Sequence, residues 1–113
     1  MNKIMKKDIV AGLGEIGLPI LKLVSKKETV VGYDLNEKLM NKNKFKKFQT
    51  TPTSFLHIAI PVTAKFDSNL IALFKKLQPE CIVIHSTISP GTIERLQKKI
   101  RVPIIYSATR GVH

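Results

Sequence analysis

The sequence predicts an α/β fold, a doubly wound parallel sheet of about five strands with helices on both faces. Short apolar runs typical of buried strands alternate along the 113 residues with amphipathic runs of helical period. The first apolar run ends in Gly12, Gly14 and Gly17, and a helical pattern follows directly. No repeat or long linker interrupts the alternation, so residues 1–113 are expected to form one domain.

Five strands and four helices are expected in turn. The strands are Asp8–Ala11, Thr29–Asp34, Phe55–Ile60, Cys81–His85 and Val102–Ser107. The first expected helix is Glu15–Val24, and the second runs from a cap at Asn36 to about Phe48 with Leu39 and Met40 facing inward. The third is capped by Asp67 or Ser68 and ends at Pro79. The fourth is capped by Ser89 and has Pro90 in its first position. We expect right-handed crossovers and the strand order 3-2-1-4-5, without the sixth strand of a full dinucleotide-binding fold.

The glycine spacing G-x-G-x-x-G between a strand and a helix predicts a loop that holds a dinucleotide. Gly12 allows the tight turn, Gly14 lets the backbone approach a pyrophosphate, and Gly17 lets the helix pack closely on the sheet. The N–H groups and the dipole of the helix then face the phosphates. The alternative is an ordinary glycine-rich turn.

A carboxylate at the end of the second strand supports the dinucleotide hypothesis. Asp34 follows Gly12 by about 20 residues, where it can accept hydrogen bonds from the adenine ribose hydroxyls. The same charge repels a 2′-phosphate and favours NAD over NADP, a preference that Lys38 weakens. The alternative for Asp34 is a surface cap on the second helix.

The composition is strongly basic, with 19 Lys and Arg against 8 Asp and Glu and a net charge of +11. Part of this charge lies in one segment that contains Lys38, Lys42, Lys44, Lys46 and Lys47. The segment is either a polyanion-binding patch or a solvated lysine-rich surface. We favour the second interpretation, and nucleic acid is not an expected partner.

Several classes of protein are excluded at this stage. No apolar run approaches the ~20 residues that a membrane span needs, and the N-terminus carries no signal-peptide core. Cys81 is the only cysteine, so neither an internal disulfide nor a cysteine-rich metal site is expected. These features are typical of a soluble cytoplasmic domain.

Three segments resemble the N-terminal NAD-binding domain of the UDP-glucose/GDP-mannose dehydrogenases. "GLGEIGLP" followed by "VVGYD" resembles the Rossmann-like cofactor loop of that family, "HSTISPGTIERL" its S-T-x-x-P-G-T element, and "YSATRGVH" its S-P-E-R segment. Together they span Ile9 to Arg110. The resemblance implies a domain of an enzyme that oxidises the C6 alcohol of a nucleotide sugar to a carboxylate with NAD as hydride acceptor.

The resemblance also implies a set of cofactor-binding residues. These are Gly12, Leu13, Gly14, Glu15, Ile16, Gly17, Asp34, Pro61, Ser86, Thr87 and Arg110. Ser86 and Thr87 are implied near the nicotinamide half, and Arg110 near the cofactor and substrate cleft. The alternative for the segment from Ser86 to Thr92 is a capped strand-to-helix turn.

The departures from the family leave the catalytic residues unassigned. His85 stands where the family has a Glu, and "IPVT" replaces the family's V-P-T-P element. If Val62 takes the place of the family's threonine, the threonine hydroxyl is lost, and Thr63 replaces it only after a small shift of the chain. The nucleophilic cysteine and the lysine of the family belong to later central and substrate-binding domains that this chain lacks. Cys81 does not replace that cysteine, because it is expected to begin a buried central strand and to serve packing.

These observations predict NAD binding with little turnover by the chain alone. A nucleotide sugar is the expected partner once the missing domains are supplied. One alternative is a nucleotide-sensing or dimerisation module that pairs two copies through the edge of the fifth strand, whose sequence "VPIIYS" is apolar. The other is a nucleic-acid binder that uses the segment from Lys38 to Lys47.

Overall fold

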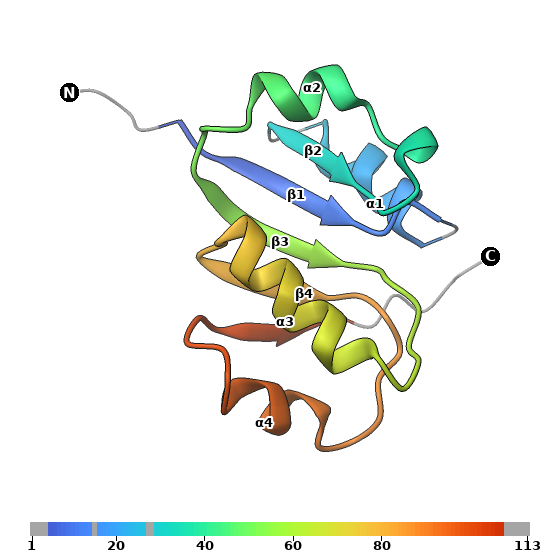
Figure 1. The fold of residues 1–113 in the computed structure, drawn as a ribbon, viewed down its shortest axis with the longest axis vertical. Coiled ribbons are helices and arrows are strands. Elements are labelled where there is room, and N and C mark those ends of the chain that lie inside the picture. The colour runs from blue at the N-terminus through green and yellow to red at the C-terminus, as the bar shows by residue number, and fades with distance from the viewer. Residues whose placement is uncertain (1–4, 15, 27–28, 108–113) are drawn as a thin grey trace.

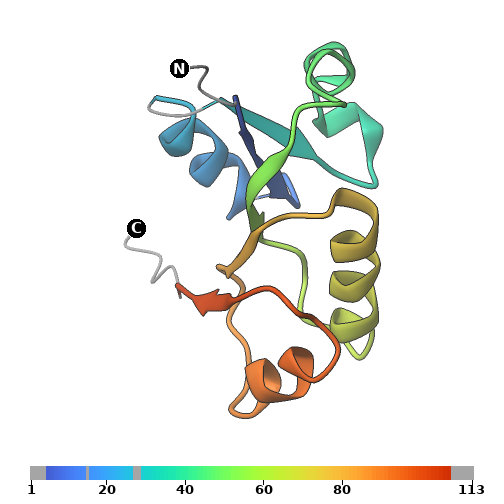
Figure 2. The same ribbon diagram turned by 90° about the vertical axis from the view of Figure 1, so that its left-hand side faces the viewer.

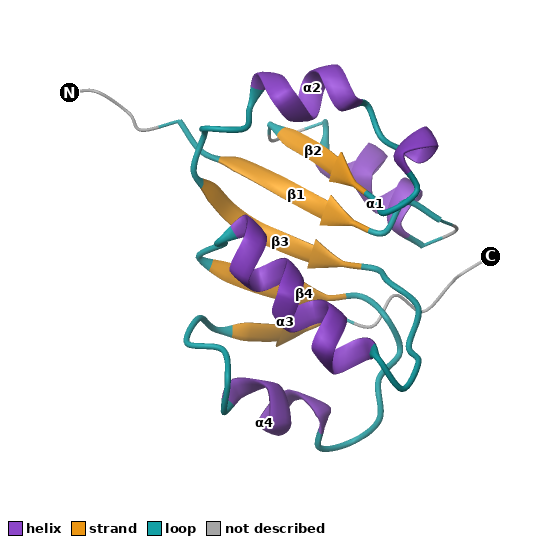
Figure 3. Ribbon diagram, viewed as in Figure 1, coloured by secondary structure: helices purple, strands orange, loops and turns teal. Residues whose placement is uncertain are grey.

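The computed structural model describes residues 5–14, 16–26 and 29–107, which form one five-stranded parallel sheet flanked by helices (Figures 1 and 3). The elements in chain order are β1 (Lys7–Ala11), α1 (Gly17–Val24), β2 (Val30–Tyr33), the 3-10 turn η1 (Glu37–Leu39), α2 (Lys42–Lys47), β3 (Thr53–Ile58), α3 (Phe66–Leu77), β4 (Cys81–Ile84), α4 (Thr92–Gln97) and β5 (Ile104–Tyr106). The predicted α/β class and the parallel five-stranded sheet are therefore confirmed.

The strand order differs from the prediction. The sheet runs β2-β1-β3-β4-β5, so the expected order 3-2-1-4-5 is wrong: β3 lies beside β1 and not outside β2. The reason is burial, because Leu56 and Ile58 of β3 are fully buried and face Ile9 and Ala11 in register. A strand at the edge beyond β2 would leave these side chains partly in water. The order reverses between β1 and β3, and ligands of doubly wound sheets bind at this switch point.

Two apolar layers cover the sheet. Figure 2 shows α1 on one face, and α3 and α4 on the other. The larger layer joins Ile9 and Leu56 of the sheet to Leu70 of α3 and Leu96 of α4. The smaller one packs Ile20 of α1 over β1 and β2. Helices therefore stand on both faces, as the doubly wound prediction requires.

The expected second helix is broken into two pieces. Asn36 caps η1 by accepting a hydrogen bond from Lys38 N, and Asn41 caps α2 in the same way through Lys44 N. Met40 between them is extended, so no single helix runs from Asn36 to Phe48. Leu39, expected to face the core, is 48% exposed. A second asparagine cap explains the break, because its side chain competes with the backbone for the helical hydrogen bond.

Two helix starts also differ from the prediction. α3 is preceded by Lys65 without a side-chain cap, and Asp67 lies inside its first turn. α4 begins two residues later than expected, at Thr92, after Gly91 with φ of 85°. The Ser89 carbonyl accepts a hydrogen bond from Thr92 N, so Ser89 and Pro90 lie in the turn before the helix. A left-handed Gly91 ends the tight turn and makes a serine cap unnecessary.

The edge of the sheet and the lengths of the helices bear on how the chain meets its surroundings. Among the described residues β5 pairs with β4 alone, so it forms an edge of the described sheet, as predicted. Cys81 begins β4, which is an interior strand of the sheet as predicted, since it pairs with β3 on one side and β5 on the other. The Cys81 side chain itself is only half-buried. The longest helix is α3 with 12 residues, and none of the helices in the described ranges could cross a bilayer.

Candidate functional site

The glycine loop joins β1 to α1 at the switch point. Gly12 has φ of 93°, and a Cβ on it would lie 2.6 Å from the Ala59 carbonyl oxygen. A Cβ on Gly17 would lie 1.5 Å from the Gly12 carbonyl oxygen. Both glycines are therefore required by the packing of the loop on itself and on the end of β3.

Gly14 differs from its two neighbours in the motif. A Cβ at this position would meet nothing within 4 Å, and its φ lies outside the left-handed region. The described protein supplies no steric reason for a glycine here. The surface in front of Gly14 is open, as a backbone that approaches a ligand requires.

Asp34 is bonded directly to the glycine loop. Its Oδ2 accepts a hydrogen bond from Leu13 N at 2.7 Å, and its Oδ1 accepts one from Asn36 N at 2.8 Å. Each carboxylate oxygen has a second lone pair for a further donor. The backbone contacts fix the position of the carboxylate at the end of β2, where the sequence predicted it. Asp34 is not the cap of the second helix, because Asn36 caps η1 and Asn41 caps α2. The bond from Asn36 N closes a local turn before η1.

α1 begins at Gly17, no described side chain caps it, and its first turn contains no acidic residue. Leu18 N donates to the Gly14 carbonyl at 3.0 Å, which binds the loop to the start of the helix. Leu13 is buried in the smaller apolar layer, and Ile16 is exposed beside the loop. The positive end of the helix dipole lies at this end of the loop, where it favours an anion.

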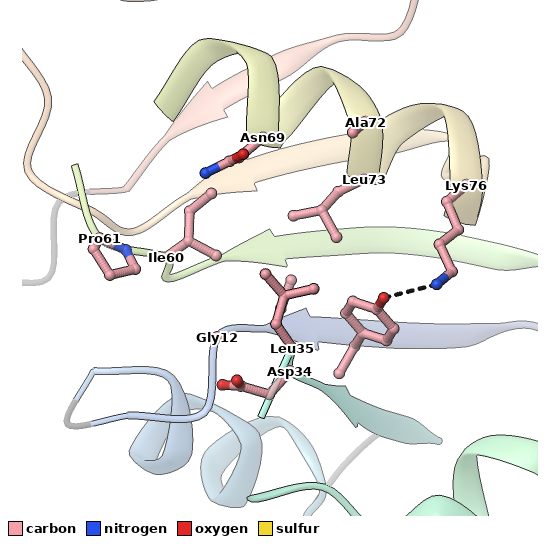
Figure 4. A pocket seen from close by; sticks show the side chains of 11 residues that line it. Gly12, Asp34, Leu35, Ile60, Pro61, Asn69, Ala72, Leu73 and Lys76 are labelled. Atoms are coloured by element: carbon pink, nitrogen blue, oxygen red, sulfur yellow. Dashed lines mark hydrogen bonds between the residues drawn. The ribbon is translucent and has the colours of Figure 1, made fainter. Parts of the chain in front are cut away.

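A cleft of about 360 Å³ lies at the switch point, in the size range of small-molecule sites (Figure 4). Its lining comes from the ends of β1 and β2, the segment after β3, and one side of α3. These residues are Ala11, Gly12, Tyr33, Asp34, Leu35, Ile60, Pro61, Asn69, Ala72, Leu73 and Lys76. Leu35 at the rim is 85% exposed. The cleft is mainly apolar, with Gly12 and Asp34 at its border.

The structure brings part of the predicted cofactor set together. Gly12, Asp34 and Pro61 line the cleft, and Leu13 is joined to Asp34 by a hydrogen bond. Glu15 and Arg110, also predicted, lie outside the described residues.

The predicted pair at the end of β4 has two different environments. Ser86 is buried, and its hydroxyl donates to the Ile60 carbonyl at 2.7 Å, which joins the end of β4 to the wall of the cleft. Thr87 is exposed. Neither residue lines the cleft, so the structure assigns Ser86 a supporting contact and leaves Thr87 at the surface.

The cleft contains polar residues that the sequence did not indicate. Asn69 and Lys76 project from α3, and Lys76 Nζ donates to the Tyr33 hydroxyl at 2.8 Å. The sequence carries a signal for them: Asn69, Ala72, Leu73 and Lys76 have the spacing i, i+3, i+4, i+7 of one helix face. The adjacent, fully apolar stripe that packs on the sheet gives the stronger periodic signal in the sequence.

His85, which replaces the acid of the resembling family, belongs to a network on the opposite sheet face. His57 Nδ1 and His85 Nε2 are 2.9 Å apart, and Asp8 Oδ2 lies 3.8 Å from His57 Nε2. Burial and the nearby His57 lower the pKa of His85 to about 4, although the Ser107 backbone acts in the opposite sense. Among the described residues, no three His, Cys, Asp or Glu side chains form a group that could hold a metal ion.

The structure also shows the surroundings of Val62 and Thr63, where the sequence differs from the resembling family. Thr63 accepts a hydrogen bond from Lys65 N through its Oγ1 and one from Phe66 N through its carbonyl, so it forms the turn before α3. Val62 is exposed. The hydroxyl of Thr63 therefore has a local structural role.

No protein-family model matches the sequence, and no curated protein matches it either.

Proposed function

We propose that this chain is an NAD-binding domain similar to that of the nucleotide-sugar 6-dehydrogenases. The observation that carries the proposal is the mainly apolar cleft at the β1/β3 switch point, bordered by Gly12 and by the anchored carboxylate of Asp34. A flat apolar base, a ribose and a pyrophosphate need these three kinds of surface side by side. The resemblance of the glycine loop and of the segment from His85 to Leu96 supports the choice of family.

Each part of the cofactor has a matching group in the chain. The apolar walls, which include Leu35, Pro61 and Leu73, suit the adenine ring. The free lone pairs of Asp34 suit the ribose hydroxyls. The open backbone at Gly14 and the start of α1 suit the pyrophosphate.

The chemistry of the bound group is hydride acceptance by its nicotinamide ring from the alcohol carbon of a substrate. This chain's residues bind and orient the adenosine half, and Ser86 braces the wall of the cleft through Ile60. We propose a nucleotide sugar as the substrate where the remaining active-site residues are supplied. We propose the cytoplasm as the compartment, since the chain has a single cysteine and cannot form an internal disulfide.

Calorimetric titration with NAD and with NADP at physiological salt tests the proposal. We expect NAD to bind more tightly, because the Asp34 carboxylate repels a 2′-phosphate. Ala72→Phe is expected to abolish binding, since Ala72 lines the cleft and its exposed position tolerates a larger side chain. Asp34→Asn is expected to weaken NAD binding about tenfold or more, as the loss of a charged acceptor does.

The matched control is Lys75→Phe, which adds the same ring to an exposed position of α3 that does not line the cleft. This variant is expected to bind NAD like the wild type. Binding that survives Ala72→Phe would place the ligand elsewhere. If neither dinucleotide binds, the glycine loop is a structural turn and the proposal is wrong.

A further inference from the structure

α3 presents two different stripes to the rest of the protein. Leu70, together with Leu73, Phe74 and Leu77, packs against the sheet. The adjacent stripe lines the cleft and consists of Asn69, Ala72, Leu73 and Lys76. Leu73 belongs to both, so the cleft wall is anchored in the core. A ligand in the cleft therefore meets a helix face that packs against the core.

Asn69 is an exposed residue of this stripe and does not cap the helix. It lies in the first part of α3, yet Lys65 precedes the helix and no side chain caps it. Asn69 N donates to the Lys65 carbonyl as an ordinary helical bond. The side-chain amide has no hydrogen-bond partner among the described residues, and asparagine is a poor helix former.

The amide is placed to meet a ligand. Figure 4 shows Asn69 beside Ile60 and Pro61, across the cleft from Asp34. The neighbouring walls are apolar, and the charged Lys76 is already bonded to the Tyr33 hydroxyl. Asn69 therefore brings an uncharged donor and acceptor to a surface that otherwise suits a flat ring.

We propose that Asn69 selects the base of the bound nucleotide by pairing with the N6 and N7 edge of adenine. An asparagine amide matches this edge, because its oxygen accepts from the N6 amino group and its nitrogen donates to N7. A 6-oxo purine presents two acceptors on the same edge and leaves the amide oxygen without a donor. This inference rests on the proposed function and adds the specificity-determining residue for the base.

A comparison of NAD with nicotinamide hypoxanthine dinucleotide tests the inference. The second compound differs from NAD in carrying an oxygen in place of the 6-amino group of the purine. For the wild type we expect it to bind roughly tenfold or more weakly than NAD, the range for a bidentate base contact. For Asn69→Ala we expect NAD binding to weaken and the ratio of the two dissociation constants to approach one.

The control is Asn43→Ala, which removes an exposed asparagine of α2 that does not line the cleft. This variant is expected to keep the wild-type ratio. Equal binding of both compounds to the wild type would overturn the role of Asn69 and leave the proposed function standing. A ratio unchanged in Asn69→Ala would do the same. Failure of both compounds to bind the wild type would overturn the proposed function and this inference together.

Discussion

At the scale of single residues, the three glycines of the loop have separate physical roles. Gly17 and Gly12 are imposed by contact, since a Cβ at either position would overlap a backbone carbonyl. Gly14 has open space around it and an ordinary φ. The lack of a side chain at Gly14 therefore matters only for a molecule that approaches the loop from outside the described residues.

This difference predicts that replacement by alanine affects stability at Gly17 and ligand binding at Gly14. Gly17→Ala is expected to lower the free energy of unfolding by several kcal/mol, at the large end for single substitutions, because the backbone of Gly12 must move. Gly14→Ala is expected to leave stability within about 1 kcal/mol of the wild type and to abolish NAD binding. Urea denaturation and calorimetric titration of both variants check this. A Gly14→Ala protein that binds NAD normally would contradict it.

The site was partly predictable from sequence for a reason that these residues make clear. Gly12, Gly17 and Asp34 belong to one consecutive β1–α1–β2 unit, so their spacing along the chain reports their geometry. Asn69 enters the cleft from a helix far along the chain. Its role depends on β3 lying beside β1, which no local pattern states.

At the scale of elements, the helix boundaries depend more on local hydrogen bonds and backbone conformation than on the periodicity of apolar residues. The strands and the core stripe of α3 agree with the sequence prediction to within a few residues at each end. The helix expected from Asn36 to Phe48 failed because Asn41 supplies a second cap inside it. The early start expected for α4 failed because Gly91 adopts a left-handed conformation. In short helices with little packing, local hydrogen bonds of this kind determine where the helix begins and ends.

The connection from α4 to β5 depends on one side chain. Gln97 Nε2 donates to the Ile100 and Val102 carbonyls, both at 3.0 Å, and Gln97 Oε1 accepts from Ile104 N at 3.2 Å. Ile104 N belongs to the exposed edge of the sheet, where an unpaired N–H invites pairing with another chain. Gln97 therefore both holds the turn and covers part of the edge.

We expect Gln97→Leu to lower the free energy of unfolding by about 1–3 kcal/mol, because two carbonyls and one N–H lose their partner. We also expect it to promote self-association through the freed edge of β5. Urea denaturation measures the first effect, and gel filtration with light scattering over a range of concentrations measures the second. Lys98→Leu, at the exposed position next in the chain, is the control. A Gln97→Leu protein that is as stable and as monomeric as this control would contradict the prediction.

At the scale of the whole molecule, strand order determines both the cleft and the open face. Placing β3 beside β1 creates the switch point where the cleft lies. The order could not be predicted from sequence, since an apolar run such as that of β3 suits any well-covered position in a sheet. α1 packs over β1 and β2, while Phe55 of β3 and Ile105 of β5 remain 39% and 49% exposed. The histidine network lies on this face.

This network joins three strands and also predicts how stability changes with pH. Asp8 of β1, His57 of β3 and His85 after β4 are linked, and Cys81 lies at the start of β4 on the same face by register. His85 has a pKa of about 4 in the folded protein, below its ordinary value of 6.5, chiefly because burial disfavours its charged form. The unfolded chain therefore binds more protons between these two values.

The sign follows from linkage: stability is full above about pH 6.5 and falls as the pH drops toward 4. Because His85 keeps partial contact with solvent, we expect His85 to contribute about 1–2 kcal/mol of this loss, less than its full shift implies. Urea midpoints at pH 7.5 and pH 5 measure the change. His85→Gln is expected to reduce the change in urea midpoint between the two pH values. His113→Gln, which removes the third histidine of the chain, is the comparison that measures the effect of replacing a histidine by itself. An equal change in urea midpoint with pH in wild type and His85→Gln would show that the histidine pair does not couple folding to protonation.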